Sequence, residues 1–354
     1  MNADQRRHLG RREFLGDAMA AGGAALLGLP SAQAARSLFG FPSRVAAAEP
    51  PSETTTIRLL ESITVCQAPL YVAEEFLRRE GFTKVEYVRT AGPALQGPLA
   101  TGEVDINISF IGPIILGIEN RNPIVILAGV HAGCFELFGT DRVQAIRDLK
   151  GKTVAVARRG GPEHAFLVSI AAYVGLQPFT DINWVMHPPD ESIQLLGEGR
   201  IDAFMALPPI SQELRARKIG HVVVSSMTDR PWSQYFCCMV TGNREFVQKH
   251  PVATKRALRA ILKAADVTAR EPARAARLLV ARGAAQRYDY ALQTMREIPY
   301  ARWRDYDPED TVRFYGLRLH EGGMVRTSPH RIIGEGTDFR FIRELRRELR
   351  RSLG

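Results

Sequence analysis

The sequence has only four cysteines among 354 residues, so its fold cannot depend on a framework of disulfides. It contains no C-x-x-C, no C-x-x-C-H and no Cys/His cluster with metal-ligand spacing, and we expect neither a bound metal nor a cofactor. No uninterrupted apolar run approaches the roughly 18 residues that a membrane-spanning helix needs. A Walker-type phosphate loop is also missing, so any ATPase that works with this protein must be another chain.

Positive charge is in excess, because the chain has 47 Lys and Arg residues but only 38 Asp and Glu residues, which gives a formal net charge of +9. A net positive charge can indicate that a protein binds nucleic acid or anionic lipid. Much of the excess lies in residues 340–351, where Glu344 and Glu348 interleave with arginines at helical spacing. Mixed signs at this spacing are typical of a solvated helix face, and no aromatic-plus-basic pattern accompanies them. We therefore expect no nucleic-acid partner.

The N-terminus has the features of an export signal. Gly10–Leu15 (GRREFL) precedes a mildly apolar run, Ala18–Leu29, which ends in Pro30–Ala34 (PSAQA). Adjacent arginines, a short apolar run and an A-x-A ending indicate a signal peptide of residues 1–34, not an anchor. The order R-R-x-F-L resembles the twin-arginine leader and predicts export to the periplasm. The alternatives are cleavage near Ala46–Ala48, or an arginine-rich start that stays on the protein.

Export bears on the cysteines, because an oxidising compartment allows disulfides to form. We expect Cys66, Cys134, Cys237 and Cys238 to be buried free thiols. Pairing of Cys134 with Cys237 or Cys238 stays open at this level.

The chain repeats itself at a shift of 97 residues, and its length suits two domains. Residues 56–112 align without gaps on residues 153–209, with nine identities that include Gly102/Gly199 and Asp105/Asp202. The hydrophobic periods coincide as well, so each copy predicts a βαβαβ unit with a parallel sheet. The expected strands are 57–63, 85–89 and 104–110 in the first copy, and 154–157, 182–186 and 201–207 in the second.

Two such units predict a clamp of two lobes. Ligands of open parallel sheets bind beyond the carboxyl ends of the strands, so two facing units form a cleft that a hinge motion can close. Strands near 124–138 and 235–241 carry the chain between the lobes, and only helices follow. We expect a linker at 35–55, a first lobe of residues 56–139 and 237–354, and a second lobe of residues 140–236.

Several segments together resemble one family, the periplasmic solute-binding proteins of the nitrate, taurine and alkanesulfonate ABC importers and their relatives for thiamine-pyrimidine precursors. The matching segments are Gly102–Asp105 (GEVD), Asp148–Val156 (DLKGKTVAV), Gly199–Ala203 (GRIDA) and Phe246–Pro251 (FVQKHP), each modest alone. The resemblance covers about residues 57–320. It implies a type II periplasmic-binding-protein fold, a small-molecule ligand, a membrane permease with a separate ATPase, and no catalysis.

One branch of that family makes the thiamine pyrimidine and carries a C-C-C-x-C stretch, where this chain has only Phe236–Met239 (FCCM). This departure, together with export, argues against the biosynthetic role. Asp105 and Asp202, the acids repeated in both copies, lie early in their strands and are expected to be structural. An exported or biosynthetic enzyme and a sensory ligand-binding protein remain the alternatives, and we expect the protein to be a monomer.

Loops at the carboxyl ends of the predicted strands supply the candidate ligand contacts. In the first lobe these are Gln67 and Ala68, after the first strand, and Ser109, at the end of the third. In the second lobe the equivalent loop carries Gly160 and Gly161, whose backbone N–H groups can face an anion or a carbonyl.

Five further residues complete the predicted site. His164 either contacts the ligand or caps its helix, and Pro208 contributes shape at the end of a strand. Trp232 and Tyr235 either stack on a flat ligand or belong to a core cluster. His131 follows an apolar strand, where it lines the hinge or only hydrogen-bonds to its neighbours.

Overall fold

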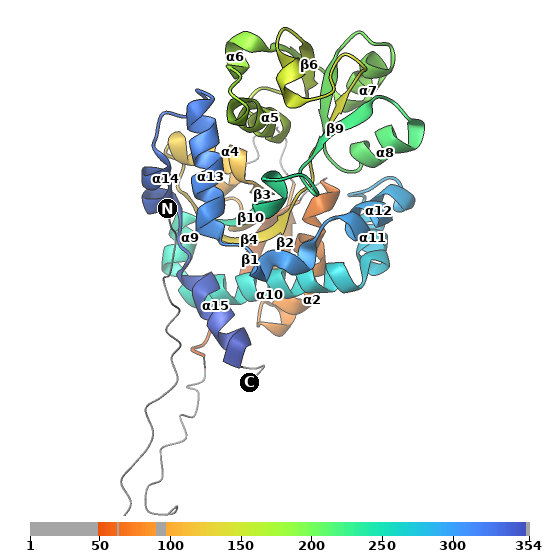
Figure 1. The fold of residues 1–354 in the computed structure, drawn as a ribbon. Coiled ribbons are helices and arrows are strands. Elements are labelled where there is room, and N and C mark those ends of the chain that lie inside the picture. The colour runs from red at the N-terminus through yellow and green to blue at the C-terminus, as the bar shows by residue number, and fades with distance from the viewer. Residues whose placement is uncertain (1–48, 62–63, 90–96, 352–354) are drawn as a thin grey trace, which may run out of the picture. The chain divides into compact units, whose positions relative to one another are not determined.

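The computed structural model describes residues 49–61, 64–89 and 97–351, and the following account concerns the compact unit Pro50–Gly354. The predicted signal peptide lies outside the described residues. Two five-stranded sheets organise this unit, with helices packed around them (Figure 1). Among the helices of the described residues, none combines the length and the apolarity needed to cross a membrane.

The first sheet has the order β2-β1-β3-β10-β4. Strands β2 and β3 are both parallel to β1, whereas β10 lies antiparallel between β3 and β4. Every residue of β4 is buried, which fits its apolar sequence, because a strand covered on both faces needs no alternation. The bounds are β1 Thr56–Leu60, β2 Lys84–Val88, β3 Ile106–Phe110, β4 Ile124–Ala132 and β10 Phe236–Asn243.

The second sheet repeats this arrangement in the order β7-β6-β8-β5-β9. Strands β7 and β8 are parallel to β6, and β5 lies antiparallel between β8 and β9. The predicted repeat therefore appears as two sheets with equivalent strand order. The bounds are β5 Glu136–Gly139, β6 Thr153–Val156, β7 Asn183–Met186, β8 Ala203–Ala206 and β9 His221–Ser225.

The two repeated acids are structural, as expected. Asp105 accepts a hydrogen bond from the backbone N–H of Arg58 at 2.7 Å and forms an ion pair with the Arg58 side chain. Asp202 accepts one from the backbone N–H of Thr153 at 2.8 Å and pairs with Arg142. Each acid thus joins the start of the central parallel strand to the segment that leads into the third strand.

The helices follow the predicted pattern, with one interruption. Residues 68–80, which follow the first predicted strand and whose apolar period predicts one helix, are divided at Ala73 into α1 and α2, although Leu77 N–H still bonds to the Ala73 carbonyl at 2.8 Å. The helices are α1 Ala68–Val72, α2 Glu74–Arg79, α3 Gly97–Thr101, α4 Ile111–Glu119, α5 Pro162–Tyr173, α6 Pro178–Asp181, α7 Pro189–Gly197, α8 Ile210–Arg217, α9 Arg244–Lys249, α10 Pro251–Arg270, α11 Pro272–Ala281, α12 Tyr288–Glu297, α13 Pro308–Glu321, α14 Pro329–Gly336 and α15 Arg340–Arg351. Four 3₁₀ segments add η1 Val65–Gln67, η2 Ile146–Leu149, η3 Trp232–Gln234 and η4 Tyr300–Arg304.

The chain passes between the sheets twice, and the two crossings lie side by side. Ser226 Oγ accepts hydrogen bonds from the backbone N–H groups of Cys134 and Phe135, at 3.0 and 2.8 Å. Gly133 has a φ of +62°, and a Cβ atom there would lie 2.5 Å from the Met227 backbone, so the first crossing requires glycine. Two adjacent connecting segments between the sheets can act as a hinge.

Strand pairing corrects one detail of the expected boundaries. The boundary at residue 139 assigned Glu136–Gly139 to the first lobe, but this strand, β5, hydrogen-bonds to β8 and β9 of the second sheet. The change of sheet thus occurs between Ala132 and Glu136, because the short turn at Gly133 redirects the chain. The division into lobes as a whole stays a prediction.

Candidate functional site

A small cavity lies where elements of both sheets meet. The first sheet contributes the segment after β1, the end of β3 and part of β10, and the second contributes the start of α5 and the residue after β8. At about 30 Å³, the cavity has room for about two water molecules, so a larger solute can enter only if the two sheets move apart. The lining residues are Thr64, Cys66, Gln67, Ser109, Phe110, Cys134, Phe135, Pro162, Leu207 and Cys238.

Two polar side chains of this cavity lack hydrogen-bond partners within the described part of the chain. They are Gln67, at its Oε1 atom, and Ser109, at its Oγ atom, and both side chains are buried. An unpaired buried polar group costs free energy, roughly 1–3 kcal/mol in proteins. Both residues belong to the predicted site. Their unsatisfied atoms leave hydrogen-bonding capacity unused within the cavity.

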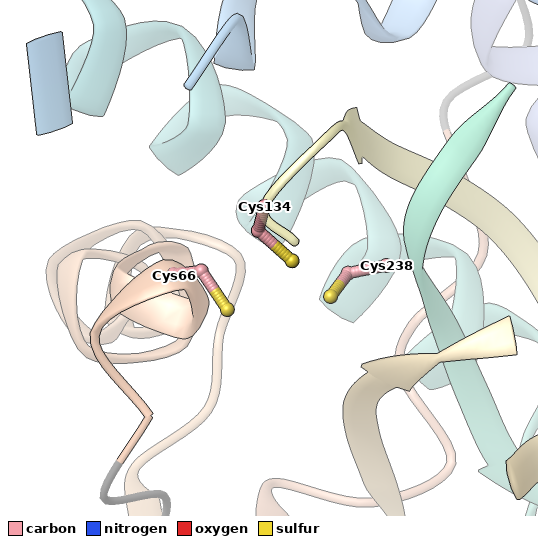
Figure 2. Close-up of side chains that lie close together, drawn as sticks. All are labelled: Cys66, Cys134 and Cys238. Carbon is pink, nitrogen blue, oxygen red and sulfur yellow. The ribbon is translucent and has the colours of Figure 1, made fainter. Parts of the chain in front are cut away.

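Three thiols face one another at the same place. The Sγ atoms of Cys66, Cys134 and Cys238 all lie within 4.8 Å of one another, and the three side chains point toward a common centre (Figure 2). The fourth cysteine is adjacent, because the Sγ atoms of Cys134 and Cys237 are 2.7 Å apart. All four are buried free thiols, as expected from the sequence.

The thiols differ in their acidity because of their surroundings. Hydrogen bonds from Cys134, Cys237 and Cys66 lower the pKa of Cys238 well below its ordinary value, against the effect of burial. Burial raises the pKa of both Cys134 and Cys237. Cys238 is therefore the thiol of this group that loses its proton most readily.

His131 lies behind the thiols and not among the residues that line the cavity. It is fully buried in β4, opposite Cys238 of β10, and its ring packs edge-on against Tyr300 with centroids 5.1 Å apart. Burial lowers the pKa of His131. The negative charge and proximity of Cys238, together with backbone contacts to Ala132 and Gly133, raise this pKa by more, so the pKa of His131 lies above its ordinary value.

The glycine loop that follows β6, with Gly160 and Gly161, forms hydrogen bonds within itself. The N–H of Gly160 donates to Nδ1 of His164 at 3.1 Å, and the N–H of Gly161 donates to the carbonyl of Arg158 at 3.4 Å. His164 is 2% exposed and packs edge-on against Trp184. Burial, with Arg159 nearby, lowers the pKa of His164 to about 4, so its ring is neutral and supports the loop from within. Of the two roles weighed for His164, this geometry favours the structural one.

The predicted aromatic contacts lie in a core cluster. Trp232 is 2% exposed and packs edge-on against Phe166 and Tyr173, with centroids 5.9 and 5.0 Å apart. Tyr235 stacks on Phe314 of α13 at 4.0 Å. Neither residue lines the cavity, so the geometry favours the core alternative that the sequence left open.

Two further predicted contacts also lie outside the lining of the cavity. Ala68 is fully buried at the start of α1, and Pro208 is buried just after β8, beside the lining residue Leu207. Of the ten predicted contacts, only Gln67 and Ser109 come together in the cavity.

The cysteines are the part of the site that the sequence pattern missed. Their spacing, with 67 residues between Cys66 and Cys134 and 103 between Cys134 and Cys238, matches no local motif. Only the pairing of β10 with β3 and β4 brings Cys238 to the loop after β1 and to the first crossing. The usable signal was that three of the cysteines lie at predicted strand ends or crossings.

Comparison with known proteins identifies the family. Residues 51–282 match the model of the NMT1-like family, which is well over half of the chain. The chain belongs to the NMT1-like family. The predicted resemblance to solute-binding proteins of ABC importers is thereby confirmed.

Individual relatives of this NMT1-like protein are distant. The nitrate/nitrite binding protein NrtA of Nostoc is 24% identical over 292 residues, which cover 73% of this chain and 66% of the relative, just under two thirds of it. Among solved structures, the periplasmic nitrate-binding protein NrtA of Synechocystis has a TM-score of 0.68 and 16% identity, covering 85% of this chain and 90% of that one. The periplasmic aliphatic sulphonate binding protein SsuA of Escherichia coli has a TM-score of 0.62 and 18% identity, covering 78% and 90%. These similarities establish the periplasmic-binding-protein fold, as predicted.

Proposed function

We propose that this NMT1-like protein is the solute-binding component of an ABC importer. It captures a small organic molecule or oxyanion between two lobes and delivers it to a membrane permease that a separate ATPase drives. The observation that carries this proposal is the cavity built from both sheets, in which Gln67 and Ser109 hold unpaired polar atoms. A site assembled from two halves of a hinged protein gains affinity by closing on its solute.

The chemistry of the cavity bears on the class of solute. No Asp, Glu, Lys, Arg or His side chain is among its described lining residues, so a strongly charged anion would lack a positive counter-charge there. Phe110 and Phe135 offer apolar faces, whereas Gln67 can both donate and accept a hydrogen bond and Ser109 offers a hydroxyl. A small, flat, weakly polar molecule fits this lining best. An oxyanion would depend on hydroxyl and amide donors.

We further propose that the protein works in the periplasm, is exported by the twin-arginine route, acts as a monomer and catalyses no reaction. The leader sequence supports the export route, and the names of the relatives support the location. The two sheets supply the whole cavity from one chain, so a second copy is not needed to complete it.

A thermal-shift screen of the purified protein tests the proposal. The panel contains nitrate, sulfonates, pyrimidines, aromatic acids and small amines. A solute that binds only the folded state stabilises it by about 2.7 kcal/mol at a hundredfold excess over Kd, which raises the melting temperature measurably. One clear stabilising solute supports a binding protein. A substrate-dependent chemical change in the same solutes would instead indicate an enzyme.

A further inference from the structure

The four cysteines of the chain converge on one buried point. Cys66 lies in η1, Cys134 follows β4, and Cys237 and Cys238 are neighbours in β10. Figure 2 shows Cys66, Cys134 and Cys238 together. Each is at most 2% exposed. Segments this far apart in the sequence meet only in the folded chain, so the group is a preformed site.

The spacing of three sulfur atoms suits a metal ion. A metal at the centre of three thiolates, with metal–sulfur bonds of about 2.3 Å, holds the sulfur atoms about 4.0 Å apart. The Sγ atoms of Cys66, Cys134 and Cys238 already lie within 4.8 Å of one another. A contraction of less than about 1 Å, within the reach of side-chain rotation, completes the triangle. Cys237 is not part of this set of three.

The composition of the group selects the class of ion. Thiolates are soft ligands that favour Cu(I) and Zn(II), whereas Mg(II), Ca(II) and Mn(II) require carboxylate or carbonyl oxygen. No carboxylate is among the described lining residues of the cavity. Structural zinc almost always takes four ligands, and Cys237 is outside the set of three whose Sγ atoms all lie within 4.8 Å of one another, so this group favours Cu(I).

We propose that Cys66, Cys134 and Cys238 together bind one soft, thiophilic metal ion, with Cu(I) as the best match. On binding, each coordinating thiol gives up its proton to solvent, and the copper stays Cu(I) throughout. The inference rests on the proposed function in one respect, because these thiols line the cavity that we assign to the solute. The metal is then either the solute itself or a resident ion against which the solute binds.

A titration with Cu(I) tests the site. The reduced full-length protein, kept under argon, competes for Cu(I) with the chromogenic chelator bicinchoninate. We expect one equivalent of copper to be withheld from the chelator. The variants Cys66→Ser, Cys134→Ser and Cys238→Ser should each weaken binding by at least about 100-fold, because each removes a direct ligand.

Cys237→Ser is the matched control. It makes the same chemical change beside Cys134, at a thiol outside the set of three, and should bind Cu(I) within about threefold of the wild type. Equal losses in all four variants overturn the assignment of these three ligands. A melting curve for each variant shows whether the protein still folds.

A second measurement does not depend on the variants. X-ray absorption of the copper-loaded wild-type protein should show three sulfur neighbours, whereas nitrogen or oxygen neighbours alone overturn the proposal. Failure of the reduced wild-type protein to bind Cu(I) also overturns it. If that protein still binds a solute of the screening panel, the metal site alone is wrong. If it binds neither, the proposed function fails as well.

Oxidation is the competing fate of the cysteines. A disulfide between Cys134 and Cys237 would form as an oxidant takes two electrons and two protons, and it would remove one of the three ligands. Counting thiols in the unfolded protein before reduction then gives two, not four. Recovery of one-equivalent copper binding after reduction supports the site, and failure to recover it contradicts the site.

Discussion

The ion pair between Arg215 and Glu297 offers a direct test of how the two halves are held together. Arg215 lies on α8, which packs by Leu214 into the core of the second sheet, and Glu297 ends α12, which packs against α11 and η1 beside the first sheet. Glu297 accepts hydrogen bonds from Arg215 at 2.6 Å and from Gln212 at 2.9 Å. The contact thus bridges the two halves.

The substitution Glu297→Gln removes the charge but keeps the shape. Arg215 itself is a poor target, because it also pairs with the buried Glu136, whose pKa burial already raises. The Arg215 and Glu297 side chains are 29% and 26% exposed, so solvent screens part of the interaction. We expect a loss of about 1 kcal/mol, which corresponds to about a fivefold increase in the opening equilibrium constant.

Amide hydrogen exchange of the solute-free protein measures this opening. Glu297→Gln should accelerate exchange about fivefold in α8 and in the last turn of α12, and leave β4 unchanged. The control is Glu213→Gln, which makes the same change in an ion pair with Arg217 within α8. Unchanged exchange in Glu297→Gln, or equal acceleration in the control, would refute the bridging role.

Two further predictions concern pH and export. The pKa of His164 is lowered to about 4 in the folded protein, whereas the unfolded chain takes up this proton near pH 6.5. The contribution of His164 to the free energy of unfolding is therefore fully present above pH 6.5 and declines by about 3 kcal/mol as the pH falls to 4. Urea unfolding across this range should show a shallower decline in His164→Gln, and an unchanged slope would contradict the buried neutral ring. Replacing both Arg11 and Arg12 by Lys should keep the protein in the cytoplasm, as cell fractionation would show, whereas undiminished export would mean that another route is used.

The fold could be predicted far into its detail, because its main signals are periodic or repeated. The strand–helix order of both units, the structural roles of Asp105 and Asp202 and the two crossings follow from local pattern and from the shift of 97 residues. The predicted lobe boundary at residue 139 lies a few residues after the change of sheet near Gly133, because the apolar sequence of a strand does not show which sheet the strand joins.

The site was less accessible to prediction, because it depends on side-chain direction and on long-range pairing. Gln67 and Ser109 were found from their positions after strands, which fix where a loop or strand end must lie. Trp232 was weighed between stacking on a flat ligand and a core cluster; it packs in a core cluster with Phe166, which no local pattern reveals. The convergence of the thiols needed the order of strands β3, β10 and β4, which only the folded chain displays.

The central claim is that a solute binds in the cavity against Gln67. Calorimetric titration of the first stabilising solute into the wild type, Gln67→Leu and Gln234→Leu tests it, since Gln234 is exposed and outside the cavity. We predict that Gln67→Leu weakens binding about tenfold, the effect of one lost hydrogen bond to a ligand, while Gln234→Leu binds like the wild type. Equal affinity of all three proteins would contradict the account.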